Sequence, residues 1–150
     1  MFPCTCRKSP VAAKQIIYHL TLPSTLKAVS RIEGFLKKVN RSVHLDEIQM
    51  HKLMVSLTEA VNNAIVHGNK QDPQKKVSVV CEVLPGWLLF VVRDQGKGFR
   101  LDGVANPLHQ KNLLRESGRG VFLMRTLMDR VEFQRKKTGM EVSLWLNVNK

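Results

Sequence analysis

The chain has 150 residues, of which 43% are hydrophobic, and it carries a formal net charge of +12 at pH 7. This length supports a single domain with a substantial hydrophobic core. No apolar run approaches the roughly 20 residues that span a bilayer, which argues against a transmembrane segment and a membrane partner. The charge predicts an anionic partner, which can be a nucleotide, a nucleic acid or an acidic protein.

Residues 1–13 carry no pattern of a regular element, and we expect a flexible tail before a domain that spans residues 14–150. The first ten residues lack a basic flank, an apolar core and a cleavage site, so they do not resemble a secretory signal. The three cysteines, Cys4, Cys6 and Cys81, form no spaced pairs, which argues against a disulfide framework. We therefore expect a cytoplasmic protein.

The first half of the chain predicts one strand and then a helix. Apolar and β-branched residues predict the strand over 15–22. A helical period then runs to residue 40, and Ser24 occupies the position of its N-cap. Gly34 lies inside this helix and lowers its stability, which indicates close packing against a neighbour.

The second helix, predicted over 45–67 with Gly68 as its stop, organises the chain. Glu59, Asn63 and His67 are four residues apart, so they stack on one helical face. A separate apolar stripe predicts the buried face of the same helix. This stripe consists of Met50, Leu53, Leu57, Ala60, Val61 and Ala64. An acid, an amide and an imidazole beside an apolar stripe indicate a functional face.

The second half of the chain predicts two hairpins on either side of a long loop. The predicted strands are 77–84, 87–93, 131–135 and 140–148, and turns at Pro85-Gly86 and Lys137-Thr138-Gly139 connect them in pairs. Residues 100–117 show no clear period, and a loop of that length inside a compact domain is usually functional. A helix is predicted to open at Gly118.

The segment Gly118-Arg119-Gly120 suits a polyphosphate. Glycines let the backbone approach a ligand closely, and a helix N-terminus presents free N–H groups with a partial positive charge. The guanidinium of Arg119 can bind phosphate oxygens through two N–H groups. The spacing matches neither the Walker pattern nor the dinucleotide fingerprint, and a tightly packed helix start is the alternative interpretation.

Asp94 follows the strand predicted over 87–93 and precedes Gly96 and Gly98. A carboxylate at this position can accept a hydrogen bond from the amino group of adenine. Because a buried acceptor without a partner is costly, such a carboxylate would select adenine over guanine. An ordinary turn is the alternative interpretation, since aspartate and glycine are common in turns.

The polar face of the second helix can hold a metal and activate a hydroxyl group. Mg²⁺ bound to phosphates takes only one or two protein oxygens, and Asn63 can supply one. Glu59 lies one turn earlier and can polarise a hydroxyl or a water aimed at the terminal phosphate. His67 is either part of this site or a helix-end residue that interacts with the last carbonyl groups.

These three segments, in this order, resemble the GHKL ATPase superfamily. The matching motifs are Glu59-Ala60-Val61-Asn62-Asn63-Ala64, Asp94-x-Gly96-x-Gly98-Phe99 and Gly118-Arg119-Gly120-Val121-Phe122-Leu123-Met124. Within the superfamily, residues 14–148 resemble the anti-sigma factor serine/threonine kinases of bacterial sporulation and stress control. The resemblance implies an α/β two-layer sandwich of the Bergerat type. Helices would cover one face of a mainly antiparallel sheet, and residues 99–117 would form an ATP lid.

The resemblance also implies ATP and Mg²⁺ as cofactors and assigns roles to residues. It implies that Asn63 coordinates Mg²⁺, Asp94 binds the adenine amino group and Glu59 is the catalytic base. The residues that it places at the ATP are Asn63, His67, Asp94, Gly96, Gly98, Phe99, Arg115, Ser117, Gly118, Arg119, Gly120, Val121 and Phe122. The family often has Gly-Thr at the start of the last strand, where the hydroxyl supports the aspartate, whereas this chain has Gly139-Met140.

Such kinases phosphorylate a serine on a small antagonist protein and otherwise sequester a sigma factor, usually as homodimers. The resemblance therefore implies an ATP-dependent serine/threonine kinase. Its implied partners are an anti-sigma factor antagonist-like protein, a sigma factor or both, and the chain would form a homodimer. A non-catalytic, ATP-gated binding module is the main alternative, because sequestering proteins share this fold.

A histidine kinase and a nucleic-acid binder would each explain less of the chain. A histidine kinase catalytic domain would sit beside a helix that carries a phosphoacceptor histidine in a dimerisation hairpin, and no predicted helix has that character. A nucleic-acid binder would account for the charge of +12 but would leave the three segments unexplained. One tyrosine, two tryptophans and six phenylalanines also provide few side chains for base stacking.

Overall fold

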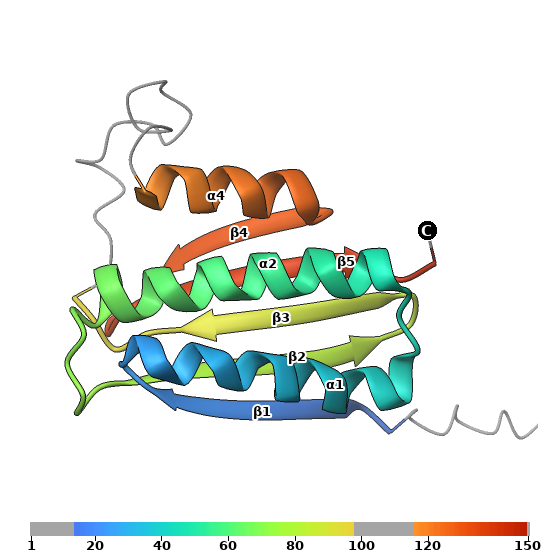
Figure 1. The fold of residues 1–150 in the computed structure, drawn as a ribbon, viewed down its shortest axis with the longest axis horizontal. Coiled ribbons are helices and arrows are strands. Elements are labelled where there is room, and N and C mark those ends of the chain that lie inside the picture. The colour runs from blue at the N-terminus through green and yellow to red at the C-terminus, as the bar shows by residue number, and fades with distance from the viewer. Residues whose placement is uncertain (1–13, 98–115, 150) are drawn as a thin grey trace, which may run out of the picture.

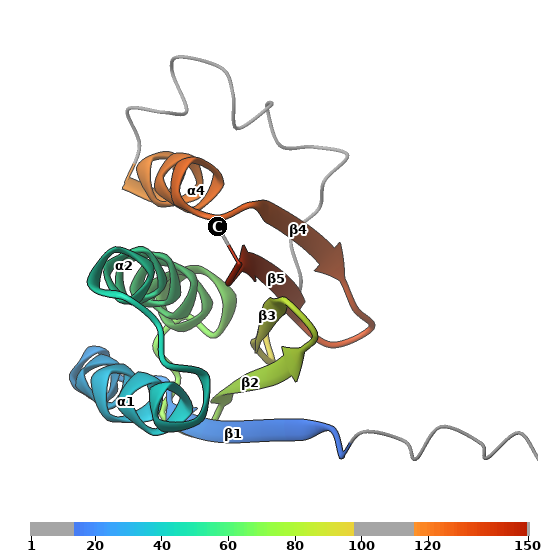
Figure 2. The same ribbon diagram turned by 90° about the vertical axis from the view of Figure 1, so that its right-hand side faces the viewer.

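A five-stranded antiparallel sheet and a layer of helices on one of its faces make up the structure. The structure is a computed structural model that describes residues 14–97 and 116–149. Figures 1 and 2 show α1, α2 and α4 side by side over the same face of the sheet. The predicted two-layer sandwich with a mainly antiparallel sheet is therefore confirmed.

The sheet places β3 at its centre. The strands are β1 (Ile16–Pro23), β2 (Lys76–Leu84), β3 (Trp87–Arg93), β4 (Arg130–Arg135) and β5 (Met140–Asn147), in the spatial order β1-β2-β3-β5-β4. Every neighbouring pair is antiparallel. Both predicted hairpins form, and their turns contain Gly86 and Gly139 with φ of +74° and +84°. Only glycine adopts such angles at little cost.

Side chains alternate along the central strands, as expected for a sheet with one covered face. Leu88, Phe90 and Val92 of β3 point into the core, and Cys81 of β2 lies among them with no exposed surface. Burial raises the pKa of the Cys81 thiol to about 12, with a smaller contribution from the neighbouring charge of Glu82. This thiol is therefore protonated at neutral pH and belongs to the core.

Within residues 14–97 and 116–149, the helix layer consists of three α-helices and two short helical segments. They are η1 (Leu26–Ser30, a 3₁₀-helix), α1 (Arg31–Val43), α2 (Glu47–Asn63), η2 (Ala64–Gly68, a π-helix) and α4 (Glu116–Leu127). The apolar stripe predicted for the second helix packs on the sheet, with Leu53, Leu57 and Ala60 buried. None of the helices in the described ranges is long and apolar enough to cross a membrane.

A capping box defines the start of α2. The Asp46 carboxylate accepts a hydrogen bond from the backbone N–H of Gln49 at 2.7 Å. The Gln49 side-chain oxygen in turn accepts from the backbone N–H of Asp46 at 3.1 Å. The two bonds satisfy donors that a helix start leaves unpaired, so α2 has a fixed first turn.

Two predictions for the first helical region are wrong. Ser24 is not an N-cap, because its hydroxyl donates to the carbonyl oxygen of Lys75 at 2.6 Å and accepts from the amide of Asn69 at 2.8 Å. The chain after it forms η1 before α1 begins, and α1 continues to Val43. Gly34 does not mark close packing either, since a Cβ atom built on it would meet nothing within 4 Å.

Candidate functional site

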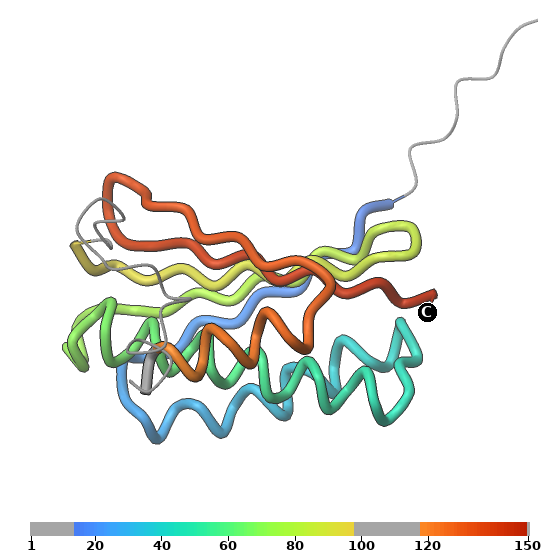
Figure 3. Tube along the Cα trace, turned by 90° about the horizontal axis from the view of Figure 1, so that it is seen from above, coloured from blue at the N-terminus to red at the C-terminus, as the bar shows by residue number. Residues whose placement is uncertain are grey.

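The predicted site segments meet at one end of the molecule. Because α2 and α4 run antiparallel, the end of α2 lies beside the start of α4 (Figure 3). The end of β3 and the start of β5 lie at that same end, in the opposite layer (Figure 1). Segments that are far apart in the sequence thus surround one region between the layers.

Glu59 and Asn63 lie against the first turns of α4. A Cβ atom on Gly120 would lie 2.5 Å from Oε2 of Glu59 and 3.5 Å from Nδ2 of Asn63. A larger residue at this position would displace the carboxylate of Glu59, so glycine leaves room for that side chain beside α4. Both side chains on α2 are partly exposed, which leaves their polar atoms within reach of a ligand.

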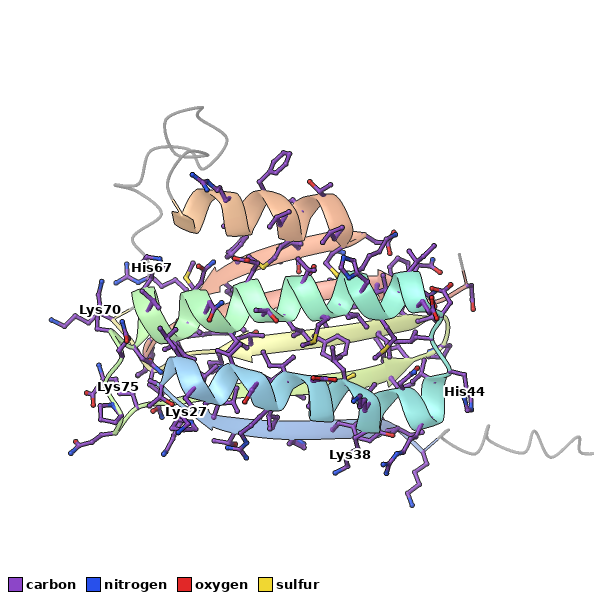
Figure 4. The ribbon with its side chains drawn as sticks, viewed as in Figure 1. Lys27, Lys38, His44, His67, Lys70 and Lys75 are labelled. Carbon is purple, nitrogen blue, oxygen red and sulfur yellow. The ribbon has the colours of Figure 1, made fainter. Side chains whose placement is uncertain are left out.

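The last turn of the second predicted helix has a different geometry from the rest. The α-helix ends at Asn63, and the next turn is the π-helix η2, in which the N–H of Asn69 donates to the carbonyl oxygen of Ala64 at 2.8 Å. His67 is exposed in this turn, as Figure 4 shows. The helical segment ends at Gly68 as predicted, and its last turn is a π-helix instead of an α-helix.

Asp94 is a buried carboxylate at the exit of β3, with only 5% of its surface exposed. Its Oδ1 atom accepts hydrogen bonds from the N–H groups of Gly96 at 2.9 Å and Met140 at 3.1 Å. Its own N–H donates to the carbonyl oxygen of Met140 at 3.1 Å. No donor within residues 14–97 and 116–149 bonds to Oδ2. Among the described residues, the carboxylate is therefore held through Oδ1 alone.

Three glycines enclose this carboxylate. A Cβ atom on Gly68 would lie 2.2 Å from Oδ2 of Asp94, and one on Gly96 would lie 2.1 Å from the carbonyl oxygen of Gly68. A Cβ atom on Gly139 would lie 2.0 Å from the carbonyl oxygen of Asp94. The end of the helix, the exit of β3 and the last hairpin can approach one another only because all three residues lack a side chain.

Met140 replaces the threonine that the family often has after this glycine. The structure shows how the aspartate is supported here, because the backbone N–H of Met140 reaches Oδ1 directly. A backbone donor does not depend on the side chain at this position. In this chain the carboxylate therefore has a backbone donor at residue 140 and no hydroxyl group there.

The segment Gly118-Arg119-Gly120 lies inside a helix and not at the first residue of one. The helix α4 begins at Glu116, two residues before Gly118. Residues 116 and 117 are therefore helical, and the predicted loop boundary at residue 117 is wrong. Gly118 and Gly120 are buried towards α2, and Arg119 is exposed between them.

The remaining predicted ligand residues divide into two groups. Val121 is half-buried and Phe122 is 53% exposed on α4. Gly98, Phe99 and Arg115 lie outside the described residues, as does most of the predicted lid, and the side chain of Ser117 is not described.

Sequence reasoning missed Asn69. It lies in a segment predicted as a polar loop, yet its side chain is fully buried and bonds to three separate segments. The sequence pattern that could have indicated a structural role is the asparagine directly after Gly68, at the end of the predicted helix. Basic side chains surround the same end of the molecule, where Figure 4 shows Lys27, Lys70 and Lys75.

Comparison with known proteins assigns the family. Residues 22–146 match the model of the histidine kinase-like ATPase domain. The chain belongs to this family. The predicted membership of the GHKL superfamily is thereby confirmed.

Curated relatives narrow the comparison. The chain is 36% identical over 110 residues to the serine-protein kinase RsbW of Bacillus subtilis, covering 69% of this chain and 67% of the relative. It is 31% identical over 134 residues to RsbW of Staphylococcus epidermidis, covering 83% and 82%. It is also 36% identical over 90 residues to the anti-sigma F factor of Oceanobacillus iheyensis, covering 59% and 60%.

A solved structure supports the fold. The RsbU and RsbW domains of Rv1364c from Mycobacterium tuberculosis superpose with a TM-score of 0.65 at 18% identity. The match covers 89% of this chain and 32% of that longer chain. At this identity the likeness concerns the arrangement of helices and strands.

Two glycine-to-alanine substitutions should have opposite effects on stability. Gly139→Ala should lower the free energy of unfolding by about 2 kcal/mol or more, because a Cβ atom disfavours positive φ by roughly 1–2 kcal/mol and also collides with Asp94. Gly34→Ala should raise it by about 0.5–1 kcal/mol, since it removes a glycine from an exposed helix interior. Urea unfolding of both variants measures the difference. Equal effects of the two substitutions would contradict the packing described around Asp94.

Proposed function

We propose that the protein is an ATP-dependent serine protein kinase of the anti-sigma-factor type. The observation that carries this proposal is the placement of Glu59 and Asn63 against the glycine-rich start of α4, in a chain of the histidine kinase-like ATPase family. The relatives named serine-protein kinase RsbW support transfer to a serine and do not favour a binding module without catalysis.

Asp94 would recognise the adenine base. Its Oδ2 atom lacks a donor among the described residues, whereas Oδ1 is fixed by two backbone N–H groups. The exocyclic amino group of adenine is a donor that would satisfy Oδ2, and the carbonyl oxygen of guanine at the same position would be repelled.

The start of α4 would bind the phosphates. The N–H groups of a helix start and their partial positive charge favour anions, and Gly118 and Gly120 allow a close approach. Arg119 is exposed next to them and can add a two-pronged contact to phosphate oxygens. The basic residues at this end of the molecule raise the local concentration of anionic ligands.

Asn63 and Glu59 fit a magnesium-dependent transfer. The amide oxygen of Asn63 is the kind of hard ligand that Mg²⁺ takes when phosphates and waters fill its other positions. When bound, Mg²⁺ supplies charge neutralisation at the phosphates. Glu59 would accept the proton of a partner's serine hydroxyl as that oxygen bonds to the γ-phosphorus and ADP leaves.

The names of the relatives also suggest partners. We propose that this chain phosphorylates a small antagonist protein and binds a sigma factor in the cytoplasm, by analogy with the relatives called anti-sigma F factor and RsbW. A homodimer is consistent with the open face of the sheet, which no described helix covers (Figure 2). That face carries the half-buried apolar side chains Trp87, Leu89, Val91 and Trp145.

Replacing the proposed base should separate binding from transfer. Glu59→Gln should reduce phosphotransfer about 10²- to 10⁴-fold, because glutamine cannot accept the serine proton. Binding of ATP should stay within about threefold, since the side chain keeps its size. The measurement is transfer from γ-labelled ATP to the antagonist protein that co-purifies with the wild type. Glu47→Gln, at the exposed start of α2, is the matched control, and transfer at the wild-type rate by Glu59→Gln would rule out the base.

Replacing Asn63 should weaken metal-dependent binding. Asn63→Ala should raise the Kd for ATP in the presence of Mg²⁺ about tenfold or more, while the Kd in EDTA changes little, because only the metal ligand is lost. Asn62→Ala is the control, since it makes the same change one residue away on another face of α2. Calorimetric titration measures both constants. If the two variants respond to Mg²⁺ alike, Asn63 does not hold the metal.

A further inference from the structure

Asn69 connects three segments of the chain that meet beside the proposed adenine site. Its Oδ1 atom accepts a hydrogen bond from the backbone N–H of Gln95 at 2.7 Å. Its Nδ2 atom donates to the carbonyl oxygen of Lys76 at 3.1 Å and to Oγ of Ser24 at 2.8 Å. The side chain has no exposed surface, so these bonds are not exchanged with water.

The bonds of Asn69 continue the sheet where β3 leaves it. The main-chain pairing of β2 with β3 ends at Arg93. Beyond it, hydrogen bonds from side chains connect the two segments. The N–H of Lys76 donates to the side-chain oxygen of Gln95 at 2.6 Å, and the carbonyl oxygen of Lys76 accepts from Asn69. The backbone at Gln95, directly after Asp94, is thereby tied to Asn69 and to the start of β2.

Ser24 anchors this network on its other side. Its hydroxyl donates to the carbonyl oxygen of Lys75 at 2.6 Å while it accepts from Asn69. The orientation of Asn69 is therefore determined, because exchanging its oxygen and nitrogen would leave the N–H of Gln95 facing a donor. Networks that are fully satisfied inside a protein hold their members rigidly.

We propose that Asn69 is a positioning residue, which fixes the turn after β3 and so sets the affinity for adenine nucleotides and their preference over guanine nucleotides. The proposal rests on the proposed function, since it takes Asp94 as the adenine-binding group. Asn69 acts through the N–H of Gln95, the residue that follows Asp94 in the chain. Loss of the bond to Gln95 would let the turn that carries Asp94 shift, and a buried acceptor that no longer meets its donor costs binding free energy.

The test is calorimetric titration of the full chain with ATP and, separately, with GTP. Asn69→Ala should raise the Kd for ATP about tenfold and reduce the preference for ATP over GTP by a similar factor. Asn62→Ala, the same change in a partly exposed side chain of α2, should alter neither value more than about twofold. A purely structural role for Asn69 would lower the midpoint of urea unfolding but leave the nucleotide preference of the folded protein unchanged, and that result would overturn the proposal.

Two further variants keep the outcomes distinguishable. Gln95→Ala removes only the bond to the N–H of Lys76 and should reduce the ATP preference about threefold, so it provides the test if Asn69→Ala does not fold. Asp94→Asn reports on the adenine site itself. If Asp94→Asn abolishes the preference and both Asn69→Ala and Gln95→Ala retain it, the positioning role is wrong and the adenine site stands. If Asp94→Asn also retains the preference, the adenine site and the positioning role both fail.

Discussion

The structure depends on one buried carboxylate at the point where the central strand ends. Asp94 is bonded through its backbone and through Oδ1 to the first residue of β5. Burying a carboxylate is costly unless hydrogen bonds compensate, so its surroundings are restricted. Gly68, Gly96 and Gly139 are the consequence, because the Asp94 carboxylate fills the space of a Cβ atom on Gly68, and backbone fills that space at Gly96 and Gly139. The glycines of the family motif are in this sense requirements of packing as well as of ligand access.

A second constraint comes from the contact between α2 and α4. Gly120 lets the start of α4 lie directly on Glu59 and Asn63, while the carboxylate of Asp94 lies beyond the end of α2. The two halves of the proposed site are therefore arranged along the same helix, since Glu59 and Asn63 lie on its last turns and Asp94 packs against Gly68 at its end. The π-helical turn η2 separates them and sets the direction in which the chain leaves. Such an arrangement can bind the adenine ring and the polyphosphate of one nucleotide at the same time.

Local patterns predicted most of the fold. The alternation in β2 and β3, their Pro85-Gly86 turn and the apolar stripe of α2 depend on neighbours in the sequence, and they were recovered nearly to the residue. The spacing of Glu59 and Asn63 was also enough to place both on one face. The family assignment followed from three short motifs in order and is confirmed by the match over residues 22–146. The roles of the individual residues at the nucleotide remain predictions.

What the sequence did not reveal depends on contacts between distant residues. Ser24 has the composition of an N-cap, but a bond to Lys75 determines its role. Asn69 belongs by composition to a loop, yet its partners come from residues on both sides of it in the chain. In the proposed function, a nucleotide binds between the end of α2, the end of β3 and the start of α4. The most direct test is a titration of ¹⁵N-labelled protein with ATP and Mg²⁺, followed through the amide signals of the nine glycines. We predict shifts at Gly68, Gly96 and Gly120 and none at Gly86, which lies at the far end of the sheet (Figure 1); unchanged signals at the first three, or shifts centred on Gly86, would contradict the account.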